Sequence, residues 1–254
     1  MLIRLQKYFT DCGVMSRRAA EAEIAKGNVT VNGETAEIGQ RIDPKKDTVL
    51  WNGKPVVSDG KKKTVCVLLN KPRGYVTTLS DERGRKTVAE LVADVGTRLY
   101  PVGRLDLDSE GLLLLTNDGE LTNRLTHPKE GIPKIYHVVV SGNLTEGQLA
   151  HLSSPLTIDD YKIRPVPVTV LDRRKSKSGK DCTVLEMVLY EGRNRQIRKM
   201  CEQTHLSVLR LKRVAIGAIS LHGVRTGEWR YLTKEEIKYL KGDADHNGAN
   251  DFPT

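Results

Sequence analysis

Three acidic residues at alternate positions stand directly before a glycine and four consecutive leucines; they are Asp106, Asp108 and Glu110. Carboxylates grouped in this way can bind a metal ion or act on a glycosidic bond. The leucine run, residues 112–115, is bounded by Gly111 and an Asp-Gly pair, which is typical of a buried strand. The acids therefore lie in a loop that meets the core, where a carboxylate is costly unless a cation such as Arg104 pairs with it.

A calcium-binding loop is one interpretation, because the three acids and Gly111 match the start of the calcium-loop pattern. That pattern ends on a bidentate glutamate, where this chain has Asn117, and is followed by a helix, where the leucines predict a strand. A carboxylate that acts on a glycosidic bond fits the residue types better. For Asp108 and Glu110 we favour the simpler interpretation of solvated loop residues.

A second chemically rich segment, residues 191–200, reads Glu-Gly-Arg-Asn-Arg-Gln-Ile-Arg-Lys-Met. If Asn194 caps a helix that ends near Gln203, Ile197, Met200 and Cys201 share a face directed to the core. The basic residues then lie beside that face at a helix N-terminus. They could form an RNA-binding surface without a catalytic part, or one arginine could keep a buried carboxylate ionised.

The composition favours a polyanionic partner. The chain has 254 residues and a net charge of +9, and its basic residues recur in clusters, which indicates RNA or DNA rather than a membrane surface. Its 4 cysteines form no C-x-x-C pair, so a reducing cytoplasm is expected and a disulfide framework or cysteine zinc site is not. The N-terminus does not resemble a signal peptide, and no apolar run is long enough to span a bilayer.

Cofactor motifs are absent from the sequence. It contains no phosphate-binding glycine loop, no dinucleotide fingerprint and no H-E-x-x-H, and its 6 histidines form no ligand pair at helical spacing. We therefore expect neither a cofactor nor a metal.

Two domains are predicted. Residues 1–55 combine two helices, over 1–12 and 17–26, with short strands and an Asn-Gly turn, and a polar linker covers residues 56–63. A larger domain over 64–241 mixes strands and helices without regular alternation, which predicts an α+β fold with a largely antiparallel sheet flanked by helices. Residues 242–254 are expected to be a disordered tail. In the larger domain, strands are expected near 64–70, 134–142, 165–171, 182–190, 207–213 and 227–232, and helices near 88–92, 120–125, 145–152, 195–203 and 234–240.

The first domain resembles the S4 RNA-binding domain over residues 1 to about 50. The likeness rests on Leu-Gln-Lys at 5–7, Gly-Val-Met-Ser-Arg-Arg at 13–18 and Lys-Gly-Asn-Val-Thr-Val-Asn-Gly at 26–33. Basic side chains near helix ends contact phosphates without reading sequence. The candidates for this role are Arg4, Lys7, Arg17, Arg18 and Lys26.

Four blocks in order resemble the RsuA/RluB/RluE/RluF family of ribosomal RNA pseudouridine synthases. They are Asn-Lys-Pro-Arg-Gly at 70–74, Pro-Val-Gly-Arg-Leu-Asp at 101–106 with the leucine run, Lys-Ile-Tyr at 134–136, and the segment at 191–200. With the S4-like module, the likeness extends to about residue 240. The family block usually ends Arg-Arg-Met, and Lys199 here replaces one cation by another.

The resemblance implies an enzyme without cofactor or metal, which flips a uridine out of folded RNA, breaks its glycosidic bond and rejoins the uracil through carbon 5. It implies that Asp106 is the essential aspartate, that Tyr136 stacks on the target base and that Arg198 pairs with Asp106. Arg104 would fill the space left by the flipped base. Further substrate-binding residues are expected at Arg195, Lys71 and Arg73.

The resemblance also implies the partners. The substrate would be ribosomal RNA, with the 23S molecule favoured over the 16S molecule, either free or in a ribosome assembly intermediate. We expect a cytoplasmic monomer that binds no membrane. The alternative is a non-catalytic RNA-binding or ribosome-assembly protein, which would not require Asp106, Tyr136 and Arg198 together.

Overall fold

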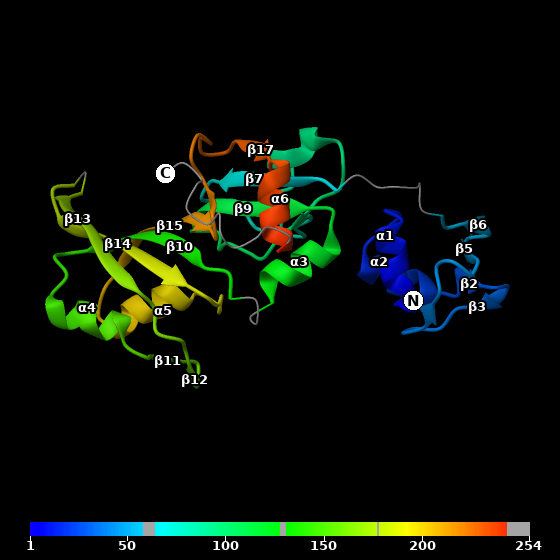
Figure 1. Ribbon diagram of the computed structural model, residues 1–254, viewed down its shortest axis with the longest axis horizontal. Coiled ribbons are helices and arrows are strands. Elements are labelled where there is room, and N and C mark those ends of the chain that lie inside the picture. The colour runs from blue at the N-terminus through cyan, green and yellow to red at the C-terminus, as the bar shows by residue number, and fades with distance from the viewer. Residues whose placement is uncertain (58–63, 128–130, 177, 243–254) are drawn as a thin grey trace. The chain divides into compact units, whose positions relative to one another are not determined.

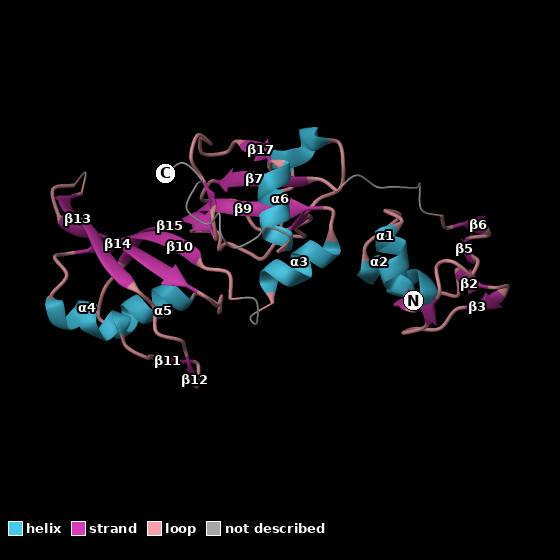
Figure 2. Ribbon diagram, in the orientation of Figure 1, coloured by secondary structure: helices cyan, strands magenta, loops and turns pink. Residues whose placement is uncertain are grey.

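The computed structural model describes residues 1–57, 64–127, 131–176 and 178–242. It separates into two compact units, Met1–Lys63 and Thr64–Thr254, and each is described by itself. Figure 1 follows the chain by colour and Figure 2 distinguishes helices from strands. Most of the expected linker and nearly all of the expected tail, residues 58–63 and 243–254, lie outside the described residues.

The first unit packs two helices against short strands. The helices are α1 (Leu5–Asp11) and α2 (Arg17–Ala25), and β1 (Ile3–Arg4) pairs with β4 (Arg41–Ile42). A four-stranded antiparallel sheet has the order β3-β2-β5-β6, made of β2 (Val29–Val31), β3 (Glu34–Thr35), β5 (Val49–Trp51) and β6 (Lys54–Pro55).

Local sequence explains most of these elements. Ser16 caps α2, since its side chain accepts from the Ala19 amide at 3.1 Å. Asn32 and Gly33 both have positive φ, as a tight turn between β2 and β3 requires. Two expectations were wrong: β1 precedes α1, so the helix begins at Leu5 and not at residue 1, and Val56 belongs to the core of this unit and not to a linker.

The second unit is built on one sheet with the order β13-β14-β10-β15-β9-β7-β17. Its strands are β7 (Cys66–Lys71), β9 (Glu110–Thr116), β10 (Lys134–Ser141), β13 (Val168–Lys175), β14 (Asp181–Leu189), β15 (Val208–Ile216) and β17 (Trp229–Tyr231). β16 (Ile219–Ser220) pairs with β15, and β8 (Tyr100–Pro101) with β9. Within this sheet only β15 and β9, among the strands of the described part, pair in parallel. The prediction of an α+β fold with a largely antiparallel sheet is confirmed.

The leucine run is buried because both faces of β9 are covered. Leu112 and Leu114 pack into one cluster with α3 (Gly119–Thr126) and α6 (Lys234–Lys241), through residues such as Leu121 and Leu240. Leu113 and Leu115 face the main core on the other side. A strand between two apolar layers has no polar alternation, which explains four leucines in a row.

Two further helices cover the other half of this sheet. α4 (Glu146–Ser153) and α5 (Gln196–Gln203) lie along β10 and β14, as Figure 2 shows. A 3₁₀ helix, η1 (Glu90–Val95), stands where a helix over 88–92 was predicted. The hairpin β11–β12 (Thr157–Ile158 and Tyr161–Lys162) was not predicted. The charged residues 173–175, predicted as a loop, extend β13 because they pair with β14. None of the described helices is long and apolar enough to cross a membrane.

Candidate active site

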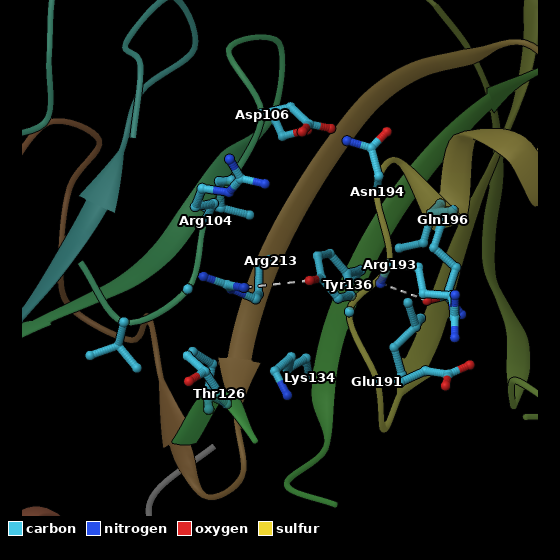
Figure 3. Close-up of a pocket in the computed structure, with 18 of the residues that line it drawn as sticks. Arg104, Asp106, Thr126, Lys134, Tyr136, Glu191, Arg193, Asn194, Gln196 and Arg213 are labelled. Carbon is cyan, nitrogen blue, oxygen red and sulfur yellow. Dashed lines mark hydrogen bonds between the residues drawn. The ribbon is translucent and has the colours of Figure 1, made fainter. Parts of the chain in front are cut away.

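A cavity of about 310 Å³ lies in the second unit between the loop before β9, the strands β10 and β15, and the segment that leads into α5. Asp106, Arg104 and Tyr136 line it together with Arg195. Figure 3 shows Asp106 at one end and Lys134 at the other, with Tyr136 and Arg213 between them. Segments about ninety residues apart in the sequence therefore meet around one space large enough for a nucleobase.

The loop that carries Asp106 is held by polar contacts to its backbone. The Thr77 hydroxyl donates to the Leu105 carbonyl at 2.6 Å and accepts from the Leu105 amide at 3.2 Å. The Lys71 ammonium donates to the carbonyls of Asp106 at 3.1 Å and Ser109 at 2.8 Å. Backbone on both sides of the carboxylate is thus anchored, which restricts its position.

Asp106 faces arginine, but not the arginine that was expected. Its Oδ2 lies 3.6 Å from Nη1 of Arg195, and the same nitrogen lies 3.4 Å from Oδ1 of Asp108. Arg198 instead contacts Asp108, through Nη2 at 3.1 Å from Oδ2 and 3.2 Å from the carbonyl oxygen. The predicted ion pair of Arg198 with Asp106 is therefore wrong in this structure.

The start of α5 explains this exchange. Asn194 does not cap the helix; the N-cap is Arg195, in the left-handed region with φ 51° and no side-chain cap bond. Arg195 thereby leaves the helical path ahead of the first turn and reaches both acids, while Arg198, one turn later, reaches only Asp108. The Gln196 Oε1 accepts from the Arg193 amide at 3.1 Å and closes the turn. The predicted apolar face is confirmed, since Ile197, Met200 and Cys201 are buried.

Asp108 is a partly solvated loop residue as expected, with its side chain 38% exposed, and it also pairs with both arginines. The expectation was wrong for Glu110, which is buried within β9, where its Oε1 lies 2.6 Å from Nη2 of Arg210. Asp106 was expected to be buried and is in fact 36% exposed at its side chain. Of the three acids, Asp106 is the one that lines the cavity, and among the described residues it has a single ion pair, at 3.6 Å.

Lys71 was expected to bind substrate, yet its side chain is fully buried, and within the described part of the chain its ammonium bonds to carbonyl groups alone. Burial lowers the pKa of Lys71 to about 8, against the opposing effect of Asp106 and the neighbouring acids. We therefore assign Lys71 a positioning role for the Asp106 loop. Arg73 is exposed and donates to the Leu209 carbonyl at 3.5 Å; it does not line the cavity.

The depressed pKa of Lys71 predicts a pH-dependent stability. Between pH 8 and its ordinary value of 10.5, Lys71 is charged in the unfolded chain and neutral in the folded protein, so the unfolded state binds more protons. The free energy of unfolding of the wild type, relative to Lys71→Met, should therefore rise by up to about 3 kcal/mol across this range and fall again as the pH returns to 8. Denaturant titrations at several pH values measure it.

Lys71→Arg is the matched control. A guanidinium supplies hydrogen-bond donors but does not lose its proton in this range, so this variant should lack the rise. Ionisation of the cysteines also changes the free energy of unfolding at high pH, but it does so equally in the wild type, Lys71→Met and Lys71→Arg, so it cancels when they are compared. Parallel stability curves for wild type and Lys71→Met would show that burial does not shift the proton equilibrium of Lys71.

Tyr136 and Arg213 form a cross-strand pair on the cavity floor. They are directly opposite each other in the pairing of β10 with β15, and Nη1 of Arg213 donates to the Tyr136 hydroxyl at 3.5 Å. Nε of Arg213 also donates to the Leu112 carbonyl at 2.7 Å. Sequence reasoning missed Arg213 and Lys134. The available signal was alternation: Leu211, Arg213 and Ala215 have the same parity in β15, and all three are buried.

The five basic residues proposed for RNA contact in the first unit are at its surface or partly buried. Arg4, Arg17 and Arg18 are exposed. Lys7 and Lys26 form ion pairs along their helices, with Asp11 at 2.6 Å and Glu23 at 3.0 Å. Both lysines are at least partly exposed, and ion pairs of this kind at a surface are weak, so the lysines can exchange them for other anions.

Similarity to known proteins points to the same kind of site. The family model "RNA pseudouridylate synthase" matches residues 65–203. The chain is 40% identical to the ribosomal large subunit pseudouridine synthase B of Bacillus subtilis, over 98% of this chain and 99% of that one. It is 37% identical to the dual-specificity RNA pseudouridine synthase RluF of Escherichia coli K12, over 92% and 77%. A crystal structure of a pseudouridylate synthase superposes with a TM-score of 0.65 at 27% identity, over 94% and 99%. The chain therefore belongs to the RNA pseudouridine synthase family of enzymes.

Proposed function

We propose that this enzyme converts a uridine of ribosomal RNA to pseudouridine, with the 23S molecule as the favoured target and the 16S molecule as the second. The observation that carries the proposal is a partly exposed carboxylate, Asp106, in a cavity whose floor holds an aromatic side chain, Tyr136. The names of the similar bacterial proteins support the RNA class. The large-subunit target rests on the relative from Bacillus subtilis.

Asp106 is the group that acts on the ribose. When the bond from the anomeric carbon to the base breaks, positive charge develops on the sugar, and a fixed carboxylate nearby stabilises it. The anchored backbone of the Asp106 loop supports this role, because an electrostatic group contributes most when it does not reorganise during the reaction. Arg195 and Arg198 hold the neighbouring Asp108 and orient the loop.

Tyr136 is the aromatic that stacks on the flipped base, and Arg104 enters the duplex space that the base vacates. Flipping costs a few kcal/mol of stacking energy, which an aromatic face and an inserted side chain can offset. Arg104 is exposed and lines the same cavity, and Figure 3 places it beside Asp106. No cofactor is needed, because the isomerisation moves one bond and neither oxidises nor reduces the substrate.

The two units have separate roles. Residues 1–55 are an S4-like RNA-binding domain whose Arg4, Lys7, Arg17, Arg18 and Lys26 contact phosphates, and residues 64–241 are the catalytic domain. The two helices with a short-stranded sheet, and the exposure of the arginines, support the first assignment. Basic contacts of this kind make affinity strongly dependent on salt. The enzyme acts as a cytoplasmic monomer, on free ribosomal RNA or on an assembly intermediate.

The proposal is tested by tritium release. Ribosomal RNA transcribed with uridine labelled at carbon 5 loses one tritium for each pseudouridine formed, because carbon 5 replaces nitrogen 1 in the bond to the ribose. We expect the wild-type protein to release tritium from 23S transcript, with no metal cofactor or nucleotide added beyond the buffer that folds the RNA. Binding of both ribosomal RNAs without any release from either would instead support a non-catalytic RNA-binding protein.

A further inference from the structure

Two cations lie on the cavity floor beside the tyrosine. Lys134 and Tyr136 are two residues apart in β10 and so point to the same side of the sheet, and Arg213 lies opposite Tyr136 in β15. All three line the cavity that contains Asp106. In Figure 3 they occupy the part of the cavity that lies away from Asp106.

Neither cation has a counter-ion in the part of the chain that the structure describes. Arg213 is 3% exposed, and its Nη2 has no hydrogen-bond partner. The Lys134 ammonium donates to the Ile132 carbonyl at 3.1 Å, and burial together with Arg213 lowers the pKa of Lys134. A buried guanidinium with an unused donor is energetically costly, so its retention on a cavity floor indicates an acceptor that a ligand brings.

The proposed reaction identifies that acceptor. With the ribose beside Asp106 and the uracil ring over Tyr136, the ring atom farthest from nitrogen 1 is carbon 4, and its carbonyl oxygen O4 points away from Asp106 toward the two cations. Guanidinium and ammonium groups only donate hydrogen bonds. Cytosine carries an amino donor at carbon 4, so donor would meet donor without an acceptor between them.

We propose that Arg213, assisted by Lys134, binds O4 of the target uracil and so selects uracil over cytosine. This inference rests on the proposed function and assigns the base-reading group within the same cavity. The pair also favours the reaction itself. When the glycosidic bond breaks, its electron pair leaves with the uracil, and the negative charge is shared between the two carbonyl oxygens, of which O4 meets the cations.

The test compares RNAs that differ at the modified base: uridine, and 4-deoxyuridine, which lacks O4 and also the hydrogen on nitrogen 3. Binding is measured in the Asp106→Asn background, which keeps the RNA unconverted. With Arg213 present, removal of O4 should weaken binding about 10- to 100-fold. With Arg213→Met, most of this difference should disappear, and any part that remains reports the change at nitrogen 3. Lys134→Met should reduce the discrimination in part, and Arg213→Lys should restore part of it.

Lys212→Met is the matched control, because Lys212 is the neighbour of Arg213 in β15, has the opposite parity and does not line the cavity. In the Asp106→Asn background, the Lys212→Met protein should bind uridine RNA more tightly than 4-deoxyuridine RNA by the same factor as the protein with Lys212. If Arg213→Met and Arg213→Lys both keep the full discrimination, the inference is wrong, whereas absence of tritium release by the wild type would overturn the proposed function instead. Should Arg213→Met fail to fold, Arg213→Lys and Lys134→Met carry the same comparison.

Discussion

The Asp106→Asn variant is expected to release tritium from labelled RNA at least about 10³-fold more slowly than the wild type. The amide has the shape of the carboxylate but carries no negative charge, so it cannot stabilise the cationic ribose. Its effect on folding should be small, within about 0.5 kcal/mol, because the side chain is 36% exposed and has one ion pair at 3.6 Å. Affinity for RNA should not fall, since a negative charge near phosphates is removed. Single-turnover tritium release and a filter-binding titration measure both quantities.

Asp108→Asn is the control for Asp106→Asn. It removes the same charge two residues away, from an acid that contacts the same Arg195 and also Arg198. Its loss of rate should be no more than about tenfold, because it acts only by loosening the two arginines. Equal losses for the two variants would mean that the arginine arrangement, and not the Asp106 carboxylate, limits the reaction. If the Asp106→Asn protein released tritium at the wild-type rate, the assignment of Asp106 as the catalytic residue would be wrong.

Gly111→Ala should destabilise the protein by at least about 3 kcal/mol. Gly111 has φ +107°, where a side chain is strained, and a Cβ built there would lie 2.2 Å from the carbonyl oxygen of Arg213. The two residues are partners in the parallel pairing of β9 with β15, so the strands would have to separate. That movement would displace Arg213 and the Asp106 loop together, and activity should fall with stability. Denaturant unfolding measures the loss.

Gly147→Ala provides the comparison for Gly111→Ala. Gly147 lies in α4, and a Cβ there would meet nothing within 4 Å. The substitution should stabilise the protein by about 0.5–1 kcal/mol through helix propensity. If Gly111→Ala unfolded within about 1 kcal/mol of the wild type, the close approach of β9 and β15 would be contradicted.

The arrangement of arginines around the acids has a consequence for catalysis. Arg195 is shared between Asp106 and Asp108, and both of its contacts are long. Ion pairs with this geometry between partly exposed groups contribute at most about 1 kcal/mol. Asp106 can therefore give up its contact with Arg195 at little cost, as its proposed contact with the ribose requires. Asp108, with Arg198 at 3.1 Å, remains as the anchor.

Local patterns in the chain were sufficient for most of the elements. The run of leucines predicted a buried strand, Ser16 predicted a helix start, and the Asn32-Gly33 pair predicted a hairpin, because each depends on neighbours within a few residues. Motif order also indicated Asp106, Tyr136 and Arg104, and all three line one cavity. Where local propensity was insufficient, pairing with the neighbouring strand β14 decided the structure: residues 173–175 are charged, yet they continue β13.

The sequence by itself determined the α+β class, the acid-bearing loop before the leucine strand, and the family to which the chain belongs. Only the tertiary structure decided which arginine meets which acid, that Lys71 supports the loop from inside, and that Arg213 lies in the cavity floor. The physical reason is distance along the chain. These contacts join segments up to about 100 residues apart, and they depend on a left-handed Arg195 and on a parallel strand pair at Gly111 that no local pattern encodes.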